Sequence, residues 1–399
     1  MIKLIRKEDC CGCSACAGIC PQKCITIKKD EEGFYYPYVD KKACVSCGLC
    51  YKTCPIANVN DEKCFTQYSY VVQNRNQAIL KDSTSGGAFT AIASYVIDNG
   101  GYVVGASMTK ELRVEHIIVN KKDELWKFRN SKYVQSYISP EIYWQVKRIL
   151  KEGKLVLFSG TGCQVEGINR CIGKSFSNNL FLVDVVCRAV PSPLILEKYI
   201  EYQQTKNKKL ISSLRFRDKY YGYQFPTINI SYKGKSCYRR GIESDPWLRA
   251  FFSGICNRPS CYECVFKRRY RVSDITIWDC FNYSNSISTM IPNAGATNVL
   301  VHTDKGRRIF DIVKKDFIVQ VVDTDQQVSE IKQMTESAMK HPKRFNFFQD
   351  ALILDGYTLF EKFFPITLKE QLLYYGRLIA VKSGIYSHLK SIIKSVNNI

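Results

Sequence analysis

Two cysteine runs near the start of the chain decide how it folds: CCGCSACAGICP at 10–21 and CVSCGLCYKTCP at 44–55. Both match C-x2-C-x2-C-x3-C-P, the bacterial spacing for cubane iron–sulfur clusters. The second run repeats the first at an offset of 34 residues, so that each cysteine of the motif has a counterpart in register. The repeat indicates a duplicated half-module.

The spacing also predicts which cysteines share a cluster. Three cysteines two residues apart can wrap one face of a cubane, and the fourth, followed by proline, ligates the partner cluster. We therefore predict a bacterial-type ferredoxin module with two [4Fe–4S] clusters. The ligands are Cys10, Cys13, Cys16 and Cys54 for one cluster, and Cys44, Cys47, Cys50 and Cys20 for the other. Cys11 and Cys24 lie outside this template.

Zinc sites and disulfides are the alternative uses of so many cysteines. Zinc sites usually combine two C-x2-C pairs, often with histidine, and the two runs do not follow that pattern. A disulfide framework needs an oxidising compartment and a secretory signal, and the stretch MIKLIRKED at 1–9 has no apolar segment of that kind. The 19 cysteines therefore favour a reducing compartment, and we expect a cytoplasmic protein.

Composition limits the remaining classes of function. The 399 residues, 45% of them hydrophobic, suffice for two or three domains with buried cores. No apolar run approaches the length of about 18 residues expected of a membrane span, and the four histidines are too scattered for histidine-centred catalysis. The net charge of +21 suggests an acidic redox partner or electron carrier, an anionic glycan or a membrane face, although a lysine-rich proteome would also explain it. No motif supports nucleic-acid binding.

Hydrophobic patterning predicts an α+β protein. The ferredoxin module contains a short hairpin between its cysteine runs, and the middle of the chain alternates apolar strands with helices. The basic tail is compatible with a core-packing helix or with a peripheral membrane contact. The predicted parts are a ferredoxin domain at 1–62, a mixed α/β domain at 63–345 with an N-part at 63–190 and a C-part at 191–345, and a helical basic tail at 346–399.

A Ser/Gly-rich turn, STSGGAF at 83–89, opens a predicted helix at 88–98. Such a turn can bind phosphate, because free amide groups and the helix dipole point at the ligand. It can equally be an ordinary helix cap.

Further cysteines lie outside the two runs. Cys163 and Cys187 each follow a predicted buried strand, where a cysteine can be a nucleophile, a metal ligand or an inert core residue. Cys261 and Cys264 form a lone C-x2-C half-site, which together with the other two would complete the four thiolates of a third cubane. The basic run KRRYR at 267–271 is most simply a solvated face, and near a cofactor it could pair with phosphates or with an acidic carrier.

Several blocks occur in an order that resembles the coenzyme F-420 hydrogenase/dehydrogenase beta-subunit family, in the form with an N-terminal two-cluster ferredoxin domain. The resemblance covers nearly all of residues 1–350. The blocks are STSGGAF at 83–89, SKYVQS at 131–136, FSGTGCQ at 158–164, CRAVPSP at 187–193, FRDK at 216–219, RPSCYEC at 258–264 and SDITI at 273–277.

The resemblance implies that the α/β domain binds a flavin, FAD or another, next to a third [4Fe–4S] cluster. The residues that match the family's flavin pocket are Ser85, Gly86, Gly87, Lys132, Tyr133, Gln135, Ser136, Gly160, Thr161 and Gln164. Those that match the cluster ligands are Cys163, Cys187, Cys261 and Cys264.

The chain departs from the family pattern at two places. Arg188 stands where the family has a titratable histidine, which makes a proton-transfer role there improbable. The stretch WDCFN at 278–282 replaces the family's Gly-Asp-Phe-Trp-Gly.

We therefore interpret the chain as an iron–sulfur flavoprotein oxidoreductase that passes electrons between ferredoxin clusters and a flavin. Relatives act on a deazaflavin coenzyme or on chlorophyll intermediates, and others belong to polysaccharide biosynthesis, so the substrate stays open. The alternatives are a non-catalytic electron-transfer subunit of a larger complex and an assembly protein with structural clusters. No catalytic side chain is predicted.

Overall fold

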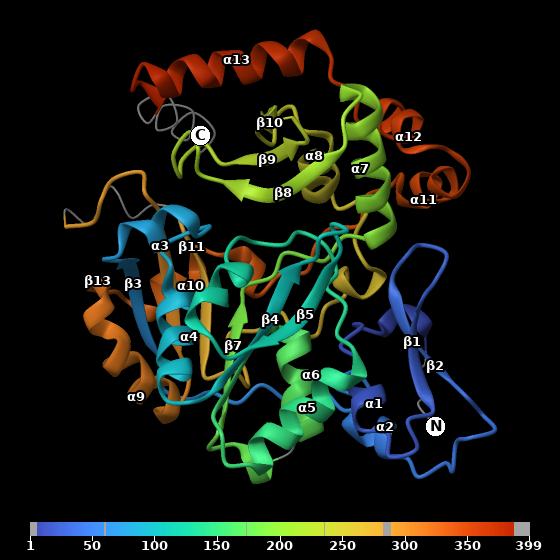
Figure 1. Cartoon of the computed structure of the whole chain (residues 1–399), viewed down its shortest axis with the longest axis vertical. Coiled ribbons are helices and arrows are strands. Elements are labelled where there is room, and N and C mark those ends of the chain that lie inside the picture. Colours follow the sequence, from blue (N-terminus) through green and yellow to red (C-terminus); the bar gives the residue numbers. More distant parts are fainter. Residues whose placement is uncertain (1–5, 60, 173, 235, 282–288, 387–399) are drawn as a thin grey trace.

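The structure, a computed structural model, describes residues 6–59, 61–172, 174–234, 236–281 and 289–386. Its N-terminal domain is small and lies beside a larger α/β body (Figure 1). The elements of this domain are the 3-10 helix η1 (Lys7–Asp9), α1 (Ala15–Gly18), β1 (Ile25–Lys29), β2 (Tyr35–Val39) and α2 (Leu49–Thr53). Strands β1 and β2 pair antiparallel, with Ile25 opposite Val39, which confirms the predicted hairpin.

The body is built on a mixed sheet of eight strands in the order β13-β3-β12-β11-β7-β6-β4-β5. Strands β4, β6, β7 and β11 run parallel to one another, and the remaining neighbours pair antiparallel. The strands are β3 (Tyr68–Asn74), β4 (Tyr102–Met108), β5 (Val114–Val119), β6 (Val156–Thr161), β7 (Leu180–Val185), β11 (Ile275–Cys280), β12 (Ala296–Val301) and β13 (Phe317–Val321). The predicted mixed α/β architecture is confirmed.

Both faces of this sheet are covered by helices, as alternation along the strands requires. Leu157 and Phe181 belong to the core beneath α4 and α9, whereas Phe158 and Leu182 belong to the core beneath α5 and α6. The helices and 3-10 turns of this part are α3 (Gln77–Asp82), α4 (Ala88–Asp98), η2 (Lys122–Phe128), α5 (Pro140–Lys151), α6 (Gly162–Ile172), η3 (Lys174–Phe176), α9 (Asp304–Val313), η6 (Lys314–Asp316), α10 (Thr324–Ser329) and η7 (Lys332–Met334).

A second, three-stranded antiparallel sheet lies above the first in Figure 1, in the order β10-β9-β8. The helices near the end of the chain pack into the core of this second sheet, where Leu359 and Phe360 are buried in the same cluster as Tyr199 and Tyr202. The elements are α7 (Pro193–Asn207), β8 (Ile211–Asp218), β9 (Thr227–Tyr232), β10 (Cys237–Arg240), α8 (Pro246–Ser253), η4 (Pro259–Cys261), α11 (Arg344–Ile353), α12 (Gly356–Phe363) and α13 (Leu368–Lys382).

The last part of the predicted basic tail, residues 387–399, lies outside the described residues. Helix α13 buries Tyr374 and Ala380 and leaves Leu368 and Leu372 exposed. Among the described residues, no helix combines the length and the apolar character that crossing a bilayer would require.

The ferredoxin domain packs closely against the α/β body. The hydroxyl of Tyr143 on α5 donates to the backbone oxygen of Cys13, and the indole Nε1 of Trp144 donates to the oxygen of Gly18 at 2.9 Å. Farther along, the guanidinium of Arg344 on α11 contacts both carboxylate oxygens of Glu32, at 2.9 and 2.5 Å. The cysteine-bearing helix α1 is therefore held by α5.

Gly18→Ala tests this packing. A Cβ at this position would lie 2.6 Å from the Cβ of Tyr143, so either the ring or the ferredoxin domain must shift. We expect a loss of about 1–3 kcal/mol in the free energy of unfolding, the usual cost of overpacking, measured by denaturant unfolding of the anaerobically purified protein. Gly376→Ala on α13 is the control, because no atom lies within 4 Å of its added Cβ. Equal curves for Gly18→Ala and the unchanged protein would contradict the close contact.

Candidate functional site

The two cysteine runs fold as structural repeats. Gly12 and Ser14 in the first run have φ of 71° and 63°, and Ser46 and Gly48, their counterparts in the second, have φ of 53° and 76°. Left-handed backbone is uncommon for serine, so its presence at matching positions is not a coincidence of residue type. Both loops therefore turn in the same way between their cysteines. The duplication seen in the sequence is therefore also present in the backbone.

The cysteines come together as the template predicts. Cys20, Cys44, Cys47 and Cys50 line one small pocket, which also contains Cys24. The Sγ atoms of Cys20 and Cys24 are 3.4 Å apart, so Cys24 is a close neighbour of this set although it lies outside the motif.

The other set lies deeper in the domain. Burial raises the pKa of Cys16 well above its ordinary value, and the sulfurs of Cys10 and Cys54 add to the effect. Thiols buried so close together ionise poorly on their own. A positively charged cluster core would stabilise their thiolate form. The donor set therefore fits a cubane.

A cavity of about 670 Å³ lies next to the ferredoxin domain, and we call it the cysteine cavity. The four cysteines predicted from the later motifs line it, together with Cys11. A hydrogen bond with Cys11 raises the pKa of the Cys163 thiol, so a residue of the first cysteine run touches this cavity. No three Cys, His, Asp or Glu side chains in the described ranges are placed to hold a single metal ion.

Strand order explains how these distant cysteines meet. β6 and β7 are parallel neighbours, so Cys163 and Cys187 follow adjacent strands at the same edge of the sheet. The backbone N–H of Arg258 donates to the oxygen of Val190 at 2.9 Å, which brings the C-x2-C turn beside the loop after β7. Burial raises the pKa of Cys187 to about 12 and raises that of Cys261 further.

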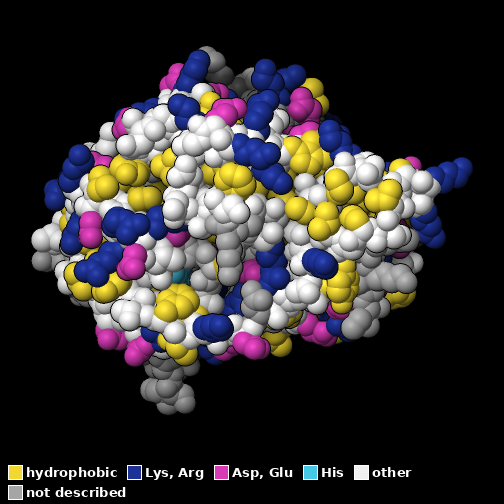
Figure 2. All heavy atoms as spheres, turned by 90° about the horizontal axis from the view of Figure 1, so that it is seen from below, with side chains coloured by type: hydrophobic (Ala, Val, Ile, Leu, Met, Phe, Trp, Pro, Cys, Tyr) yellow, Lys and Arg dark blue, Asp and Glu magenta, His cyan; other side chains and the backbone are white. Residues whose placement is uncertain are grey.

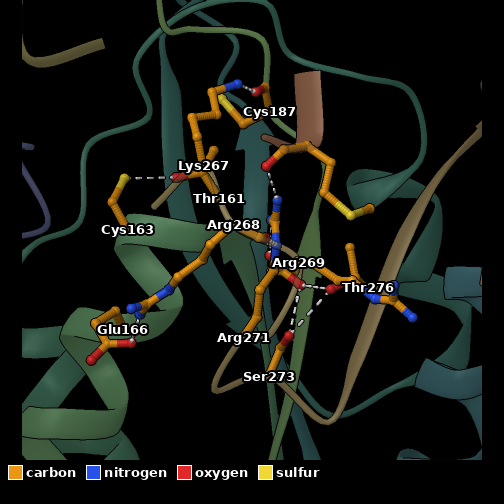
Figure 3. Close-up of polar contacts among 12 residues, drawn as sticks. Thr161, Cys163, Glu166, Cys187, Lys267, Arg268, Arg269, Arg271, Ser273 and Thr276 are labelled. Atoms are coloured by element: carbon orange, nitrogen blue, oxygen red, sulfur yellow. Dashed lines mark hydrogen bonds and ion pairs between the residues drawn. The ribbon is translucent and has the colours of Figure 1, made fainter. Parts of the chain in front are cut away.

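The simplest prediction for the basic run at 267–271, a solvated face, is wrong. Most of its cationic side chains are paired inside the fold (Figure 3). The ammonium of Lys267 donates to the backbone oxygen of Cys187, and Arg268 pairs with the buried carboxylate of Glu166 at 3.2 Å. Arg271 pairs with Asp184 at 2.6 Å, where the side chains are 7% and 0% exposed. The carboxylates come from α6 and β7, far away in sequence, so composition alone could not reveal them.

A second cavity, of about 620 Å³ and thus similar in volume to the first, lies on the other side of the loop that carries Cys187. We call it the large cavity because of the length of chain that lines it, from Ser83 to Tyr386. Eight of the ten residues predicted for the flavin pocket line it, and they are Ser85, Gly87, Lys132, Tyr133, Ser136, Gly160, Thr161 and Gln164. The amide of Gln164 ties two walls together, because it accepts from Thr161 N at 3.0 Å and donates to Ser136 Oγ at 2.9 Å.

Two of the predicted pocket residues lie elsewhere, which corrects the prediction for them. Gly86 packs against backbone, and its added Cβ would lie 2.6 Å from Thr297 N. Gln135 faces the ferredoxin domain, where its Oε1 accepts from Tyr35 N at 3.1 Å and from Arg258 Nη1 at 3.2 Å. Alternation explains the second case, because neighbouring side chains in an extended segment point to opposite sides.

The sequence analysis missed several side chains of the large cavity. Arg217, only 5% exposed, pairs with Asp279 and lies 5.1 Å from the ring centroid of Tyr223 and 5.2 Å from that of Phe281. The FRDK block contains Arg217, but its partner on β11 is apparent only in the fold. Lys132, by contrast, was among the predicted pocket residues. Burial lowers the pKa of Lys132 to about 7, and its Nζ donates to two backbone oxygens at 3.0 and 2.9 Å.

The two cavities share a wall. Thr161 and the loop residues Cys187, Arg188, Ala189 and Val190 line both of them. The Oγ1 of Thr161 is 3.1 Å from the Sγ of Cys163, so the polar end of β6 faces the cysteine cavity as well (Figure 3).

Together, these features define an iron–sulfur redox protein in which a two-cluster ferredoxin domain is joined to an α/β domain. Family models match three segments: the 4Fe-4S dicluster domain at 9–58, the N-terminal part of the coenzyme F420 hydrogenase/dehydrogenase beta subunit at 69–140, and the C-terminal part of that subunit at 153–327. The chain belongs to the coenzyme F420 hydrogenase/dehydrogenase beta-subunit family, in the form with an N-terminal dicluster domain.

Individual proteins resemble different parts of the chain. An uncharacterized ferredoxin of Methanocaldococcus jannaschii is 38% identical over 52 residues, which are 13% of this chain and 66% of that ferredoxin, slightly less than two thirds of its length. One subunit of the F420H2 dehydrogenase of Methanosarcina mazei is 20% identical over 79% of this chain and 85% of its own. A chain in the structure of the F420-reducing [NiFe] hydrogenase complex of Methanosarcina barkeri aligns over 71% of this chain and 99% of its own, with 15% identity and a TM-score of 0.47.

Arg271→Met tests the buried pair behind the cysteine cavity. The change leaves the carboxylate of Asp184 buried beside the hydroxyls of Ser273 and Thr276, without its counter-charge. We expect the free energy of unfolding to fall by about 3–5 kcal/mol. Arg269→Met is the matched control, because its partner Asp325 is 81% exposed and such pairs contribute about 1 kcal/mol or less. If Arg271→Met and Arg269→Met lost similar amounts of unfolding free energy, the buried charge pair of Arg271 and Asp184 would contribute no more than an exposed one.

Proposed function

We propose that this protein is an iron–sulfur flavoprotein oxidoreductase in which three [4Fe–4S] clusters exchange electrons with a flavin. The observation that carries the proposal is the shared wall of the cysteine cavity and the large cavity. A cluster in the first and a flavin in the second would be separated by little more than the Cys187–Val190 loop. The substrate and the direction of electron flow are not part of the proposal, and a reducing compartment such as the cytoplasm suits the many thiols.

The order of the sites supports an electron path. The pocket of Cys44 and Cys47 is lined by residues of the ferredoxin domain alone, whereas Cys13 of the other set packs into the core of α5 and α6 and so lies toward the body. Cys11 is next to that inner set and touches Cys163 in the cysteine cavity. The clusters would thus form a line that ends at the large cavity.

Cys163, Cys187, Cys261 and Cys264 would hold the third cluster. Lys267 and Arg271 also line the cysteine cavity and would balance the negative charge of the thiolates. The backbone oxygen of Cys187 accepts from Lys267, so the loop between the two cavities is held from the cluster side.

The large cavity fits a flavin by size and by lining. Its volume lies within the roughly 300–1,000 Å³ that is usual for cofactor sites, and aromatic rings such as those of Tyr133 and Phe251 form part of the wall. The Nε atoms of Arg129 and Arg188 are buried and lack a hydrogen-bond partner among the described residues, so they suit an anionic ligand such as a phosphate. A bound flavin would supply the switch between one-electron transfer and two-electron chemistry.

The residues of the chain itself would position the ligand and not transfer protons. Gln164 fixes the end of β6 against Ser136. Arg188 is a permanent cation at the shared wall, and its Nη2 donates to the oxygen of Phe252 at 2.9 Å, so it stabilises negative charge without titrating.

A second candidate is an electron-transfer subunit without turnover of its own. The observation that favours it is the likeness to the F420H2 dehydrogenase protein of Methanosarcina mazei, whose name describes one subunit of that enzyme. Turnover of a small substrate by the purified chain alone would exclude this alternative.

The decisive experiment is to quantify iron, sulfide and flavin in one anaerobically purified sample. We expect about twelve irons and one flavin per chain. The double variant Cys261→Ser/Cys264→Ser should retain about eight irons and lose the reduction of the flavin by the ferredoxin clusters. Cys237→Ser on β10, an exposed thiol outside both cavities, is the control. About eight irons in the unchanged protein would contradict the third cluster.

Val185→Trp tests the flavin separately. This side chain lies at the end of β7, is 36% exposed and lines the large cavity, so an indole there should fill the site without disturbing the core. We expect the flavin content to fall at least tenfold while iron stays at about twelve. Val321→Trp at the exposed end of β13 is the control. Full flavin content in Val185→Trp would show that the flavin binds elsewhere.

A further inference from the structure

The outer pocket of the ferredoxin domain reaches the surface through a face that we call the Cys47 face. Cys47 is exposed, and around it lie Val45, Leu49 and Tyr51, of which Val45 is 62% and Leu49 39% exposed. Leu49 and Tyr51 are on α2, and Val45 and Leu49 also line the pocket of the cysteines. The face is therefore apolar next to the sulfurs.

Three lysines are close in sequence to this apolar centre. Lys41 and Lys42 precede the cysteine run and Lys52 lies one turn after Leu49 on α2, all three exposed. The segment 41–59 contains no aspartate or glutamate, and within the described part of the chain no ion pair is recorded for these lysines. Figure 2 shows Lys/Arg side chains beside hydrophobic ones at the right-hand end, the side on which the ferredoxin domain lies in Figure 1.

The other cluster site offers less access. Cys13, Cys16 and Cys54 are each at most 9% exposed, and Cys10 is partly exposed, whereas Cys47 of the outer site is fully at the surface. The body closes over them, since a Cβ at Gly167 on α6 would lie 3.0 Å from the Sγ of Cys13. An external protein can therefore approach the outer site far more closely than the inner one.

We infer that the Cys47 face docks a small, acidic, one-electron carrier protein. The positive rim would attract and orient the carrier, and the small apolar centre would bring its redox group near the outer cluster, as in weak, transient electron-transfer contacts. One electron leaves the reduced carrier and reduces the outer cluster, and no proton has to move. The inference rests on the proposed function only for the fate of the electron beyond the ferredoxin domain.

The test uses a reduced acidic flavodoxin, whose hydroquinone becomes the semiquinone when it loses one electron. The anaerobic protein and the hydroquinone are mixed, and semiquinone formation gives the second-order rate constant. We expect Lys42→Glu/Lys52→Glu to lower this constant about tenfold or more at low ionic strength. The difference should shrink at high salt, because screening removes the attraction.

The control is Arg308→Glu/Lys315→Glu, the same change of charge on α9 and η6 at the opposite end of the molecule. Its rate constant should stay within about twofold of the unchanged protein. Iron content and complete reduction by dithionite establish that each variant holds its clusters. An equal fall in both variants, or no fall in Lys42→Glu/Lys52→Glu, would overturn the docking site.

Three further measurements separate this inference from its rivals. Val185→Trp without flavin should still accept the electron at the normal rate, so failure of the flavin proposal would leave the docking result interpretable. Zero-length carbodiimide coupling to oxidised flavodoxin should cross-link Lys41, Lys42 or Lys52, and cross-links confined to other lysines would contradict it. Loss of binding to phosphatidylserine vesicles in Lys42→Glu/Lys52→Glu, with an unchanged rate constant, would assign the face to a membrane instead.

Discussion

The junction between the ferredoxin domain and the α/β body depends on one buried cation, Arg258. Its Nε donates to the backbone oxygen of Cys10 at 2.6 Å, its Nη1 donates to Gln135 Oε1 at 3.2 Å, and its guanidinium lies 4.1 Å from the ring centroid of Tyr36. The side chain is fully buried. A buried charge is costly without such partners. Because the Nη2 of Arg258 has no hydrogen-bond partner among the described residues, the arginine depends on these three contacts, two of which reach the ferredoxin domain.

The same residue also orders the cysteine cavity. The backbone N–H of Arg258 pairs with Val190, and the C-x2-C turn begins three residues later. One residue thus connects the first cysteine run through its side chain and the loop after β7 through its backbone. This double attachment explains how three of the four segments whose thiols line the cavity come together, and the fourth, with Cys163, follows the neighbouring strand β6.

The wider architecture follows from the parallel strands at the centre of the large sheet. Ligands in such sheets gather where the strands end, because loops of neighbouring strands meet at the same edge. β6 and β7 place Thr161 and Cys187 at that edge. The loop after β7 lines both cavities, one on each side. The buried pairs of Arg271 with Asp184 and of Arg268 with Glu166 hold the segment behind it.

Much of the local structure could be predicted because it depends on short-range patterns. Two strand-like segments on either side of a turn predicted the hairpin of β1 and β2, and apolar runs predicted the strands before Cys163 and Cys187, which are β6 and β7. The prediction for Gln135 failed because a loop residue between two domains has partners on both sides, and the sequence does not tell which side it faces.

The sequence by itself determined that the chain begins with a two-cluster ferredoxin domain, and it predicts the ligands of the two clusters. A cubane requires thiolates at short, regular spacing, and proline after the last cysteine directs the chain to the partner cluster. Only the tertiary structure decided that Cys11 touches Cys163, that the basic run is buried, and that Cys47 lies at the surface. Such contacts join residues that are far apart in the chain, and they depend on strand order and domain docking, which short-range spacing does not encode.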